Sequence, residues 1–264
     1  MPEETVRQAS MTTYEIIATI LAVIALLQPW IITIWKKFFK PLKVTFIPSA
    51  KIKLYYNCSG AYIYLGGVIE AKNRPTVIKD ISAKVIRQSD KAELTMDWSS
   101  FMVPVFQSVG GNSVTTSEIA RPFMIGANGL NPIFVEFANA DIQAVDRLSK
   151  IHEKLKLESK RISNINTPFD EAKNQLQAMP EYQAFREELL ENFYWKISDY
   201  KIELTINYDD DKIETYRYLF SLDQDEVSEF KKNIDEAMLC ELENLYYQPV
   251  NLTVFQKSFI AWEE

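Results

Sequence analysis

The sequence predicts an α+β fold in which a single N-terminal transmembrane helix precedes an antiparallel β-sandwich of the immunoglobulin-like type, with a helical insertion and a late helix. Three observations predict it. An apolar run without any charge extends from Ile16 to Trp35. Between residues 44 and 140, segments rich in Val, Ile, Tyr and Phe often alternate with polar residues. After residue 140, apolar residues recur every three or four positions, as in amphipathic helices.

The apolar run has the length of a membrane span. From Ile16 to Trp35, within "EIIATILAVIALLQPWIITIWKKFFKP", a helix would extend about 30 Å, the thickness of a bilayer's hydrocarbon core. A secretory signal would have a basic leading segment, a shorter apolar core and a small-residue cleavage site. A core helix would show a polar face at helical spacing. The run therefore predicts a transmembrane helix over residues 14–36.

Basic residues beside the run predict its orientation. Lys36, Lys37, Lys40 and Lys43 follow the run, whereas Arg7 is the single basic residue before it. Because basic residues stay on the cytoplasmic side, residues 1–13 are expected outside as a short extracytoplasmic tail. Residues 37–43 then form a basic juxtamembrane segment, and the remaining chain is cytoplasmic. We therefore predict a single-pass protein of the cell inner membrane.

The apolar run has two unlike sides. At 100° per residue, small or polar residues gather on one side and bulky Ile and Leu residues on the other. Small residues let helices approach closely, which makes these the candidates for helix association: Ala18, Ala22, Ala25 and Pro29. In a ring of such helices, the candidates for facing a pore are Thr12, Glu15, Thr19 and Thr33. The alternative is a chance asymmetry in a passive anchor.

Residues 44–140 are predicted to form the β-sandwich. The strands are expected in "KVTFIPSAKIKLYYN", "AYIYLGGVIEAKN", "TVIKDISAKVIRQ" and "NPIFVEFAN". Turn formers bound them at residues 57–60, 73–75, 110–112 and 128–132. The segment from residue 73 into "TVIKDISAKVI" resembles the hairpins of immunoglobulin-like domains, although the Cys…Trp…Cys signature is absent.

Residues 141–196 are predicted to form a helical insertion. A first helix is expected over 141–163, and a second from Pro168 to about Phe193, interrupted or restarted at Pro180. Thr167 is the expected N-cap of the second helix, with Pro168 at its first position.

Residues 197–264 are predicted to complete the cytoplasmic domain. "YKIELTINY" and "KIETYRYLFSL" form a hairpin around three aspartates, and a helix follows over 223–247. "VNLTVFQKSFIAW" is the expected last strand, which closes the sheet.

No residue pattern indicates catalysis, so we expect no enzyme activity, no metal and no cofactor. His152 is the single histidine, and it occupies an apolar helical position typical of a structural histidine. Cys58 and Cys240 fit a reducing compartment and provide no zinc-ligand cluster. "SVGGNSVTT" lacks the lysine and helix of a phosphate-binding loop and indicates a hairpin. The aspartates at 209–211 are expected to be a solvated turn rather than a cation site.

A basic run in the first predicted helix is the candidate binding site for an anion or oligonucleotide. Its residues are Arg147, Lys150, Lys154, Lys160 and Arg161. Four of them share one helical face, which favours either a solvated surface or a strip that contacts phosphates. The net charge of −7 argues against a broad nucleic-acid surface without excluding a local patch.

One N-terminal membrane helix, a β-rich domain and helical elements, in this order, resemble the membrane effectors of bacterial antiphage defence systems, most closely the Hailong type. The resemblance concerns the layout of the whole chain. It implies a homotetrameric, ligand-gated channel held shut by a single-stranded deoxyadenylate oligomer, a nucleotide signal made by a partner nucleotidyltransferase. Loss of that ligand during infection would open the channel. The alternative is a membrane-tethered β-sandwich that docks a partner protein.

Overall fold

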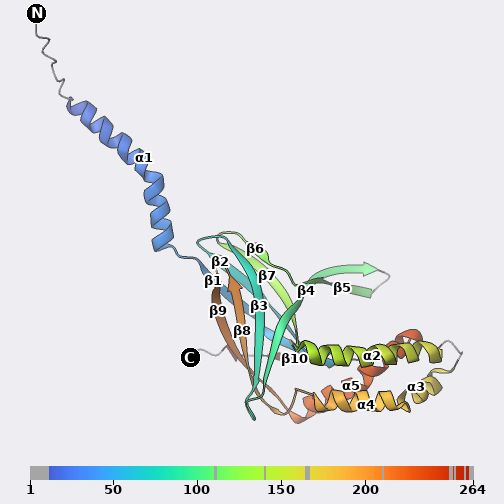
Figure 1. The fold of residues 1–264 in the computed structure, drawn as a ribbon. Coiled ribbons are helices and arrows are strands. Elements are labelled where there is room, and N and C mark those ends of the chain that lie inside the picture. The colour runs from blue at the N-terminus through green and yellow to red at the C-terminus, as the bar shows by residue number, and fades with distance from the viewer. Residues whose placement is uncertain are drawn as a thin grey trace, which may run out of the picture.

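The computed structural model describes residues 12–109, 112–139, 141–163, 167–209, 211–249, 252, 254–258 and 260–261. It is an α+β structure with an N-terminal apolar helix and a large antiparallel sheet. Figure 1 shows α1 projecting from one end of the sheet and the helices α2–α5 gathered at the other end.

Helix α1 (Thr13–Phe39) is long and apolar enough to cross a membrane over Thr13–Trp35, and none of that span is buried in the protein. The helix bends in its middle (Figure 1). Pro29 lies inside it and explains the bend, because proline lacks an N–H and its ring clashes with the preceding turn.

Eleven strands of the described residues form one sheet. They are β1 Lys43–Asn57, β2 Gly60–Lys72, β3 Thr76–Arg87, β4 Glu93–Val109, β5 Asn112–Ile119, β6 Phe123–Ile125, β7 Gly129–Asn139, β8 Ser198–Tyr208, β9 Lys212–Leu222, β10 Phe255–Ser258 and β11 Ile260–Ala261. The strands expected near 43–57, 61–73, 76–88 and 131–139 are therefore confirmed, as is the late hairpin. The hairpin expected at "SVGGNSVTT" corresponds to the pairing of β4 with β5, but the sequence reasoning did not delimit β4 to β6 as strands.

The immunoglobulin-like sandwich is not confirmed, because the strands pair into a single sheet. Its order is β10-β1-β2-β7-β4-β3-β8-β9-β11, with β5 paired to β4 and β6 to β3. The pairing of β3 with β8 joins the early strands to the late hairpin, from Arg87 opposite Tyr200 to Ile78 opposite Tyr208. Two separate sheets would leave this pairing unmade.

The C-terminal segment brings the two edges of the sheet together. Strand β10 pairs with β1, with Phe255 opposite Leu54, and β11 pairs with β9, with Ile260 opposite Leu219. The sheet is consequently almost a barrel, which leaves few unpaired strand edges. The single last strand predicted over this segment is therefore two short strands, β10 and β11, which together close the sheet.

Side chains alternate between the inside and the outside of this sheet. In β8, Ile202, Leu204 and Ile206 point inward and are buried, while the residues between them are partly exposed. An aromatic cluster lies where the sheet meets the helices: Trp195 is fully buried, and its ring stacks on Phe230 at 6.3 Å between centroids. This continuous core fixes which side chains of each strand remain outside.

Four helices cover the end of the sheet remote from α1 (Figure 1): α2 Ile142–Ser163, α3 Phe169–Gln177, α4 Pro180–Glu191 and α5 Gln224–Leu245. The restart at Pro180 is confirmed. The N-cap prediction for α3 is wrong by one residue, because Pro168 rather than Thr167 is the N-cap. Helix α5 begins at a reciprocal cap in which Asp223 accepts from the Glu226 N–H and Glu226 accepts from the Asp223 N–H.

Candidate functional site: a basic and aromatic groove on the sheet

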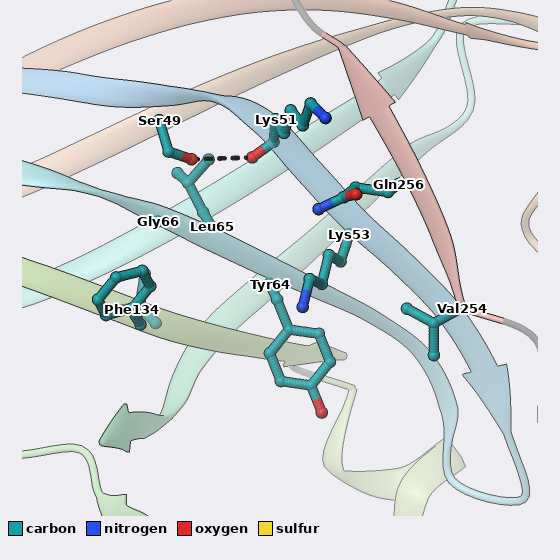
Figure 2. Close-up of a pocket in the computed structure, with 10 residues that line it drawn as sticks. Ser49, Lys51, Lys53, Tyr64, Leu65, Gly66, Phe134, Val254 and Gln256 are labelled. Carbon is teal, nitrogen blue, oxygen red and sulfur yellow. Dashed lines mark hydrogen bonds between the residues drawn. The ribbon is translucent and has the colours of Figure 1, made fainter. Parts of the chain in front are cut away.

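An open groove of about 740 Å³ lies on the outer face of the sheet, between β1, β2, β7 and the segment that leads into β10. Figure 2 shows the side chains that line it. The polar and aromatic ones are Ser49, Lys51, Lys53, Tyr64, Phe134 and Gln256.

A β-bulge in β1 shapes one wall of the groove. The register of β1 against β2 shifts between Pro48 and Ile52, and Ala50 within the shift has φ 63°. The Ser49 hydroxyl donates to the Lys51 carbonyl at 3.1 Å and holds the bulge (Figure 2). Because Ile52 is buried after the bulge, the alternation of the strand places Lys51 and Lys53 outside.

An aromatic ring covers the floor of the groove. Phe134 on β7 is the register partner of Gly66 on β2. A Cβ atom at Gly66 would approach the Phe134 ring to 3.0 Å, so glycine lets this ring lie against the strand. Phe134 nevertheless remains 43% exposed, which leaves part of the ring open to a ligand.

Tyr64 on β2 is fixed by a ladder of tyrosines. Tyr55 stacks between Tyr62 and Tyr64, with ring centroids 4.7 and 5.1 Å apart. The Tyr64 hydroxyl donates to Tyr55, which donates to Glu136 at 3.1 Å. Burial raises the pKa of Tyr64, so its hydroxyl stays neutral and keeps the hydrogen that it donates to Tyr55. The ladder holds the Tyr64 ring at a defined angle beside the groove.

The electrostatics of the groove are one-sided. Lys51 and Lys53 form no ion pair with any residue that the structure describes. Among the described residues, those that line the groove include no Asp, Glu, His or Cys. The groove therefore combines two ammonium groups with two aromatic rings, which suits binding of an anion with flat groups and offers no general base or nucleophile pair.

The basic residues predicted on α2 are all exposed, but they differ in their partners. Arg147 donates to Glu188, and Arg161 donates to Glu158 at 2.6 Å. Lys150, Lys154 and Lys160 form no ion pair within the described part of the chain. The strip therefore presents three free lysines, while two acidic side chains partly neutralise its arginines.

The polar residues predicted to face a pore are satisfied within α1. Thr12 and Glu15 cap the helix start, with the Thr12 N–H donating to the Glu15 carboxylate at 2.8 Å. The Thr19 hydroxyl donates to the Glu15 carbonyl, and the Thr33 hydroxyl to the Pro29 carbonyl, both at 2.8 Å. The predicted association residues are all exposed along the helix: Ala18, Ala22, Ala25 and Pro29.

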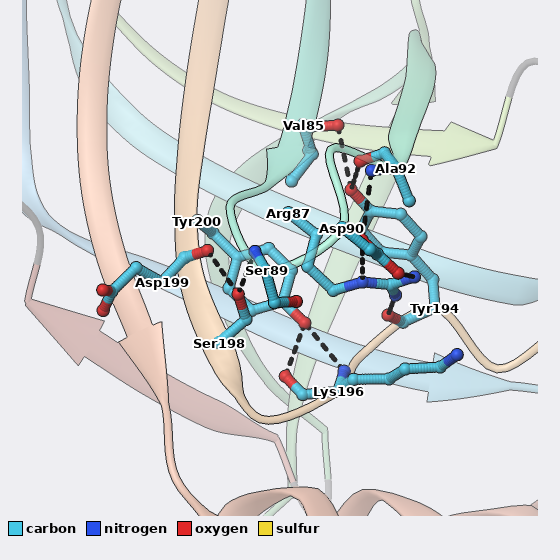
Figure 3. Close-up of polar contacts among 10 residues, drawn as sticks. All are labelled: Val85, Arg87, Ser89, Asp90, Ala92, Tyr194, Lys196, Ser198, Asp199 and Tyr200. Carbon is cyan, nitrogen blue, oxygen red and sulfur yellow. Dashed lines mark hydrogen bonds and ion pairs between the residues drawn. The ribbon is translucent and has the colours of Figure 1, made fainter.

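A second polar cluster is structural rather than open to a ligand (Figure 3). Arg87 is only 5% exposed, and its guanidinium donates to both carboxylate oxygens of Asp90 and to the Tyr194 carbonyl. The Tyr194 hydroxyl donates back to the Val85 carbonyl at 2.9 Å. The cluster joins the β3–β4 turn to the segment before β8, and each nitrogen of the guanidinium donates a hydrogen bond within it.

The remaining sequence candidates lie apart from the groove. His152 is half-buried beside Phe185, as expected for a structural histidine. Asp211 pairs with Lys79 at 2.9 Å, while Asp210, Gly110 and Gly111 lie outside the described residues. Among the residues described, no group of His, Cys, Asp and Glu side chains is placed to hold a metal ion.

No protein-family model and no curated protein matches this sequence.

The sequence reasoning missed the groove. One local signal was present, because Lys51 and Lys53 alternate with apolar residues in a strand and must share its outer face. The neighbouring rings come from β2 and β7, and only strand pairing brings them beside these lysines.

Proposed function

We propose that this chain is a single-pass membrane protein whose extramembrane domain binds a nucleotide or a short single-stranded oligonucleotide in the groove. The observation that carries the proposal is the presence of two unpaired lysines beside two aromatic rings. Lysines contact phosphates, and aromatic rings stack on bases with about 1–3 kcal/mol per base. The groove volume of about 740 Å³ falls in the range of ligand sites.

The test compares two pairs of lysines in the full-length protein in detergent. Binding of a fluorescent single-stranded deoxyadenylate oligomer is measured by anisotropy. We expect Lys51→Gln with Lys53→Gln to abolish binding, and the matched pair Lys150→Gln with Lys154→Gln on α2 to retain it. Binding by the unaltered protein is expected to weaken steeply with salt, because phosphate contacts release counterions.

The outcomes distinguish the groove from the strip on α2 and from the absence of a nucleotide site. Loss of binding only in the α2 pair would move the site to the strip predicted from sequence. Retained binding in both pairs would contradict both sites. A protein that binds no oligomer or mononucleotide at low salt would favour the alternative, a tethered module that docks a partner protein.

The aromatic part of the groove is tested separately. Phe134→Ala removes the ring over Gly66 and is expected to cost about 1–3 kcal/mol of binding free energy if a base stacks there. Phe134→Tyr keeps the ring and is expected to bind as the unaltered protein does. Equal affinity of the Ala and Tyr variants would contradict stacking. Thermal unfolding of both variants separates loss of binding from loss of fold.

A second candidate function is the homo-oligomeric, ligand-gated channel that the antiphage resemblance implies. It is favoured by α1, where Pro29 supplies no N–H to the carbonyl of Ala25, on the side that also carries Ala18 and Ala22. In a membrane, such a carbonyl is satisfied by a neighbouring helix or by ordered water. This supports association of several copies through that side.

Association and conduction have separate tests. Ala18→Leu with Ala22→Leu is expected to dissociate an oligomer by overfilling the helix contact, whereas Ile20→Leu with Ile24→Leu is not. Native mass spectrometry from nanodiscs measures the size of the oligomer.

In planar bilayers, Glu15→Lys is expected to reduce cation preference at the outer mouth. A protein that passes no current with the oligomer present or absent would leave α1 as a tether.

The orientation is part of the same proposal. The basic residues at the end of α1 and directly after it favour an N-terminus outside the inner membrane and a sheet in the cytoplasm. A cysteine at Ser10 is expected to react with a membrane-impermeant reagent in intact cells, and one at Lys91 only after lysis. The reverse pattern would contradict the cytoplasmic placement.

A further inference from the structure

Several strand ends share the end of the sheet where α1 joins it, and we call this end the membrane-side rim (Figure 1). Lys43, the first residue of β1, pairs with Lys72 at the end of β2. The starts of β3, β7 and β9 lie at the same end of the sheet. There, Thr76 pairs with Ile125, Gly129 with Ala71 and Lys212 with Tyr208. The rim is therefore a ring of strand ends and turns around the point where the chain leaves α1.

Exposed apolar side chains gather on this rim. They lie on four strands, are 41–74% exposed, and are Val77, Met124, Leu130 and Ile213. Val77 is the register partner of Met124. Leu130 and Ile213 each come one residue after a strand begins, as does Val77. Single exposed apolar residues are ordinary, but a set at one level of a sheet indicates an interaction surface.

The covalent link to α1 fixes what this surface meets. The Asn73 side-chain amide in the β2–β3 turn donates to the Pro41 carbonyl at 2.8 Å, and Leu42 is buried. The chain is thus bound to the rim from Pro41 onward. From Trp35 to Phe39 the helix rises about 6 Å, and the extended step to Pro41 adds at most about 7 Å. The rim therefore begins at most about 13 Å beyond Trp35, and the headgroup layer occupies about 5–7 Å of that distance.

The charges of the rim suit anionic headgroups. Lys40, Lys43 and Arg74 form no ion pair within the described part of the chain. Three acidic side chains nearby are paired instead: Glu70 with Lys72, Asp209 with Lys212 and Asp211 with Lys79. Glu214, beside Ile213, accepts a hydrogen bond from the Tyr208 hydroxyl. The rim thus presents two exposed lysines, Lys40 and Lys43, and the half-buried Arg74, while three of the carboxylates around them are already paired.

We propose that the membrane-side rim rests on the lipid bilayer, with the side chains of Val77, Met124, Leu130 and Ile213 in contact with the headgroup layer and Lys40, Lys43 and Arg74 contacting anionic lipid. The proposal rests on α1 crossing the membrane, which is part of the proposed function, but it is independent of any ligand in the groove. An amphipathic surface of this kind binds an interface through its apolar area together with its basic residues. The contact holds the sheet in one orientation on the bilayer.

The test uses the full-length protein in vesicles of phosphatidylcholine with phosphatidylglycerol. In a background of Cys58→Ala with Cys240→Ala, an environment-sensitive fluorophore is attached at Met124→Cys, Ile24→Cys or Lys91→Cys. Lys91 lies in the β3–β4 turn, at the opposite end of β3 from the rim. Quenching by spin-labelled lipid reports contact with the bilayer. We expect the Met124 label to be quenched roughly half as strongly as the Ile24 label, and the Lys91 label to remain unquenched.

The controls separate the rim from the anchor. Quenching at Ile24 without quenching at Met124 would overturn rim contact and leave the membrane helix intact. Absence of quenching at Ile24 would overturn the anchor and this proposal together. Vesicles of phosphatidylcholine alone are expected to reduce quenching at Met124 and not at Ile24. Circular dichroism of each labelled variant confirms that the sheet is folded before quenching is compared.

Discussion

At the residue scale, the clearest buried charge is Arg87, which has a structural role. Its guanidinium is held by Asp90 and the Tyr194 carbonyl and lies 5.0 Å from the centroid of the Tyr194 ring. A buried cation each of whose three nitrogens donates a hydrogen bond rigidifies the elements that supply its acceptors. It also makes stability depend on the protonation of its acidic partner.

Asp90→Asn is expected to destabilise the protein at neutral pH and to matter less in acid. Hydrogen bonds from Arg87 lower the Asp90 pKa from 3.8 to about 2, so the carboxylate stabilises the folded state above about pH 4. That contribution is lost as the pH falls toward 2. Thermal unfolding midpoints of the two proteins are therefore expected to converge between pH 4 and pH 2. Asp199→Asn, at an exposed carboxylate, is the control, and a gap of constant size would contradict the linkage.

At the element scale, the packing where β1 pairs with β2 beside the bulge depends on Gly67. A Cβ atom at Gly67 would overlap the Phe46 ring and would approach the Ile47 carbonyl oxygen to 2.7 Å. Phe46 is buried, and its ring packs edge-on against Tyr216 at 5.9 Å. The close approach of the two strands is therefore set by Gly67.

Gly67→Ala is expected to destabilise the fold by about 1–3 kcal/mol, because the Phe46 ring has to move out of the core. Gly126→Ala is the matched control, since nothing lies within 4 Å of its Cβ position. It is expected to change stability by less than about 0.5 kcal/mol. Chemical denaturation of both variants measures the difference. Equal midpoints would show that the β1–β2 pair adjusts without strain.

At the scale of the whole molecule, a short segment near the C-terminus closes the sheet. Phe255 packs against Phe230 of α5 at 4.5 Å between ring centroids, and Lys257 pairs with Glu226. Both residues belong to β10, which pairs with β1 at one edge of the sheet, and β11 directly after it pairs with β9 at the other edge. Closure therefore depends on a few side chains that attach this segment to α5.

Phe255→Ser is expected to open the closure without unfolding the sheet. Amide hydrogens of β10 and of β11 are expected to exchange faster with solvent, whereas those between β3 and β8 keep their protection. Val254→Ser provides the control, because Val254 is 48% exposed in the same segment. Hydrogen exchange followed by mass spectrometry distinguishes the two. Uniformly faster exchange would show instead that the closure and the sheet unfold as one unit.

The sequence by itself determined the elements whose cause is local. The uninterrupted apolar run specified α1, and alternation between turn formers specified strands such as β1 and β3. Pro180 specified the restart between α3 and α4. The β4–β5 region lacked so clear an alternation, so its hairpin was expected but the extent of its strands was not. The N-cap of α3 was misplaced because Thr167 and Pro168 both suit a helix start.

Only the tertiary structure decided how these elements combine. Pairing of β3 with β8 made one nearly closed sheet in place of the predicted sandwich. The same pairing rules placed Phe134 over Gly66 and formed the groove beside Lys51. A strand's own residues specify which of its faces is apolar, but they do not specify which strand lies beside it. That choice depends on non-local burial and on the twist of the sheet.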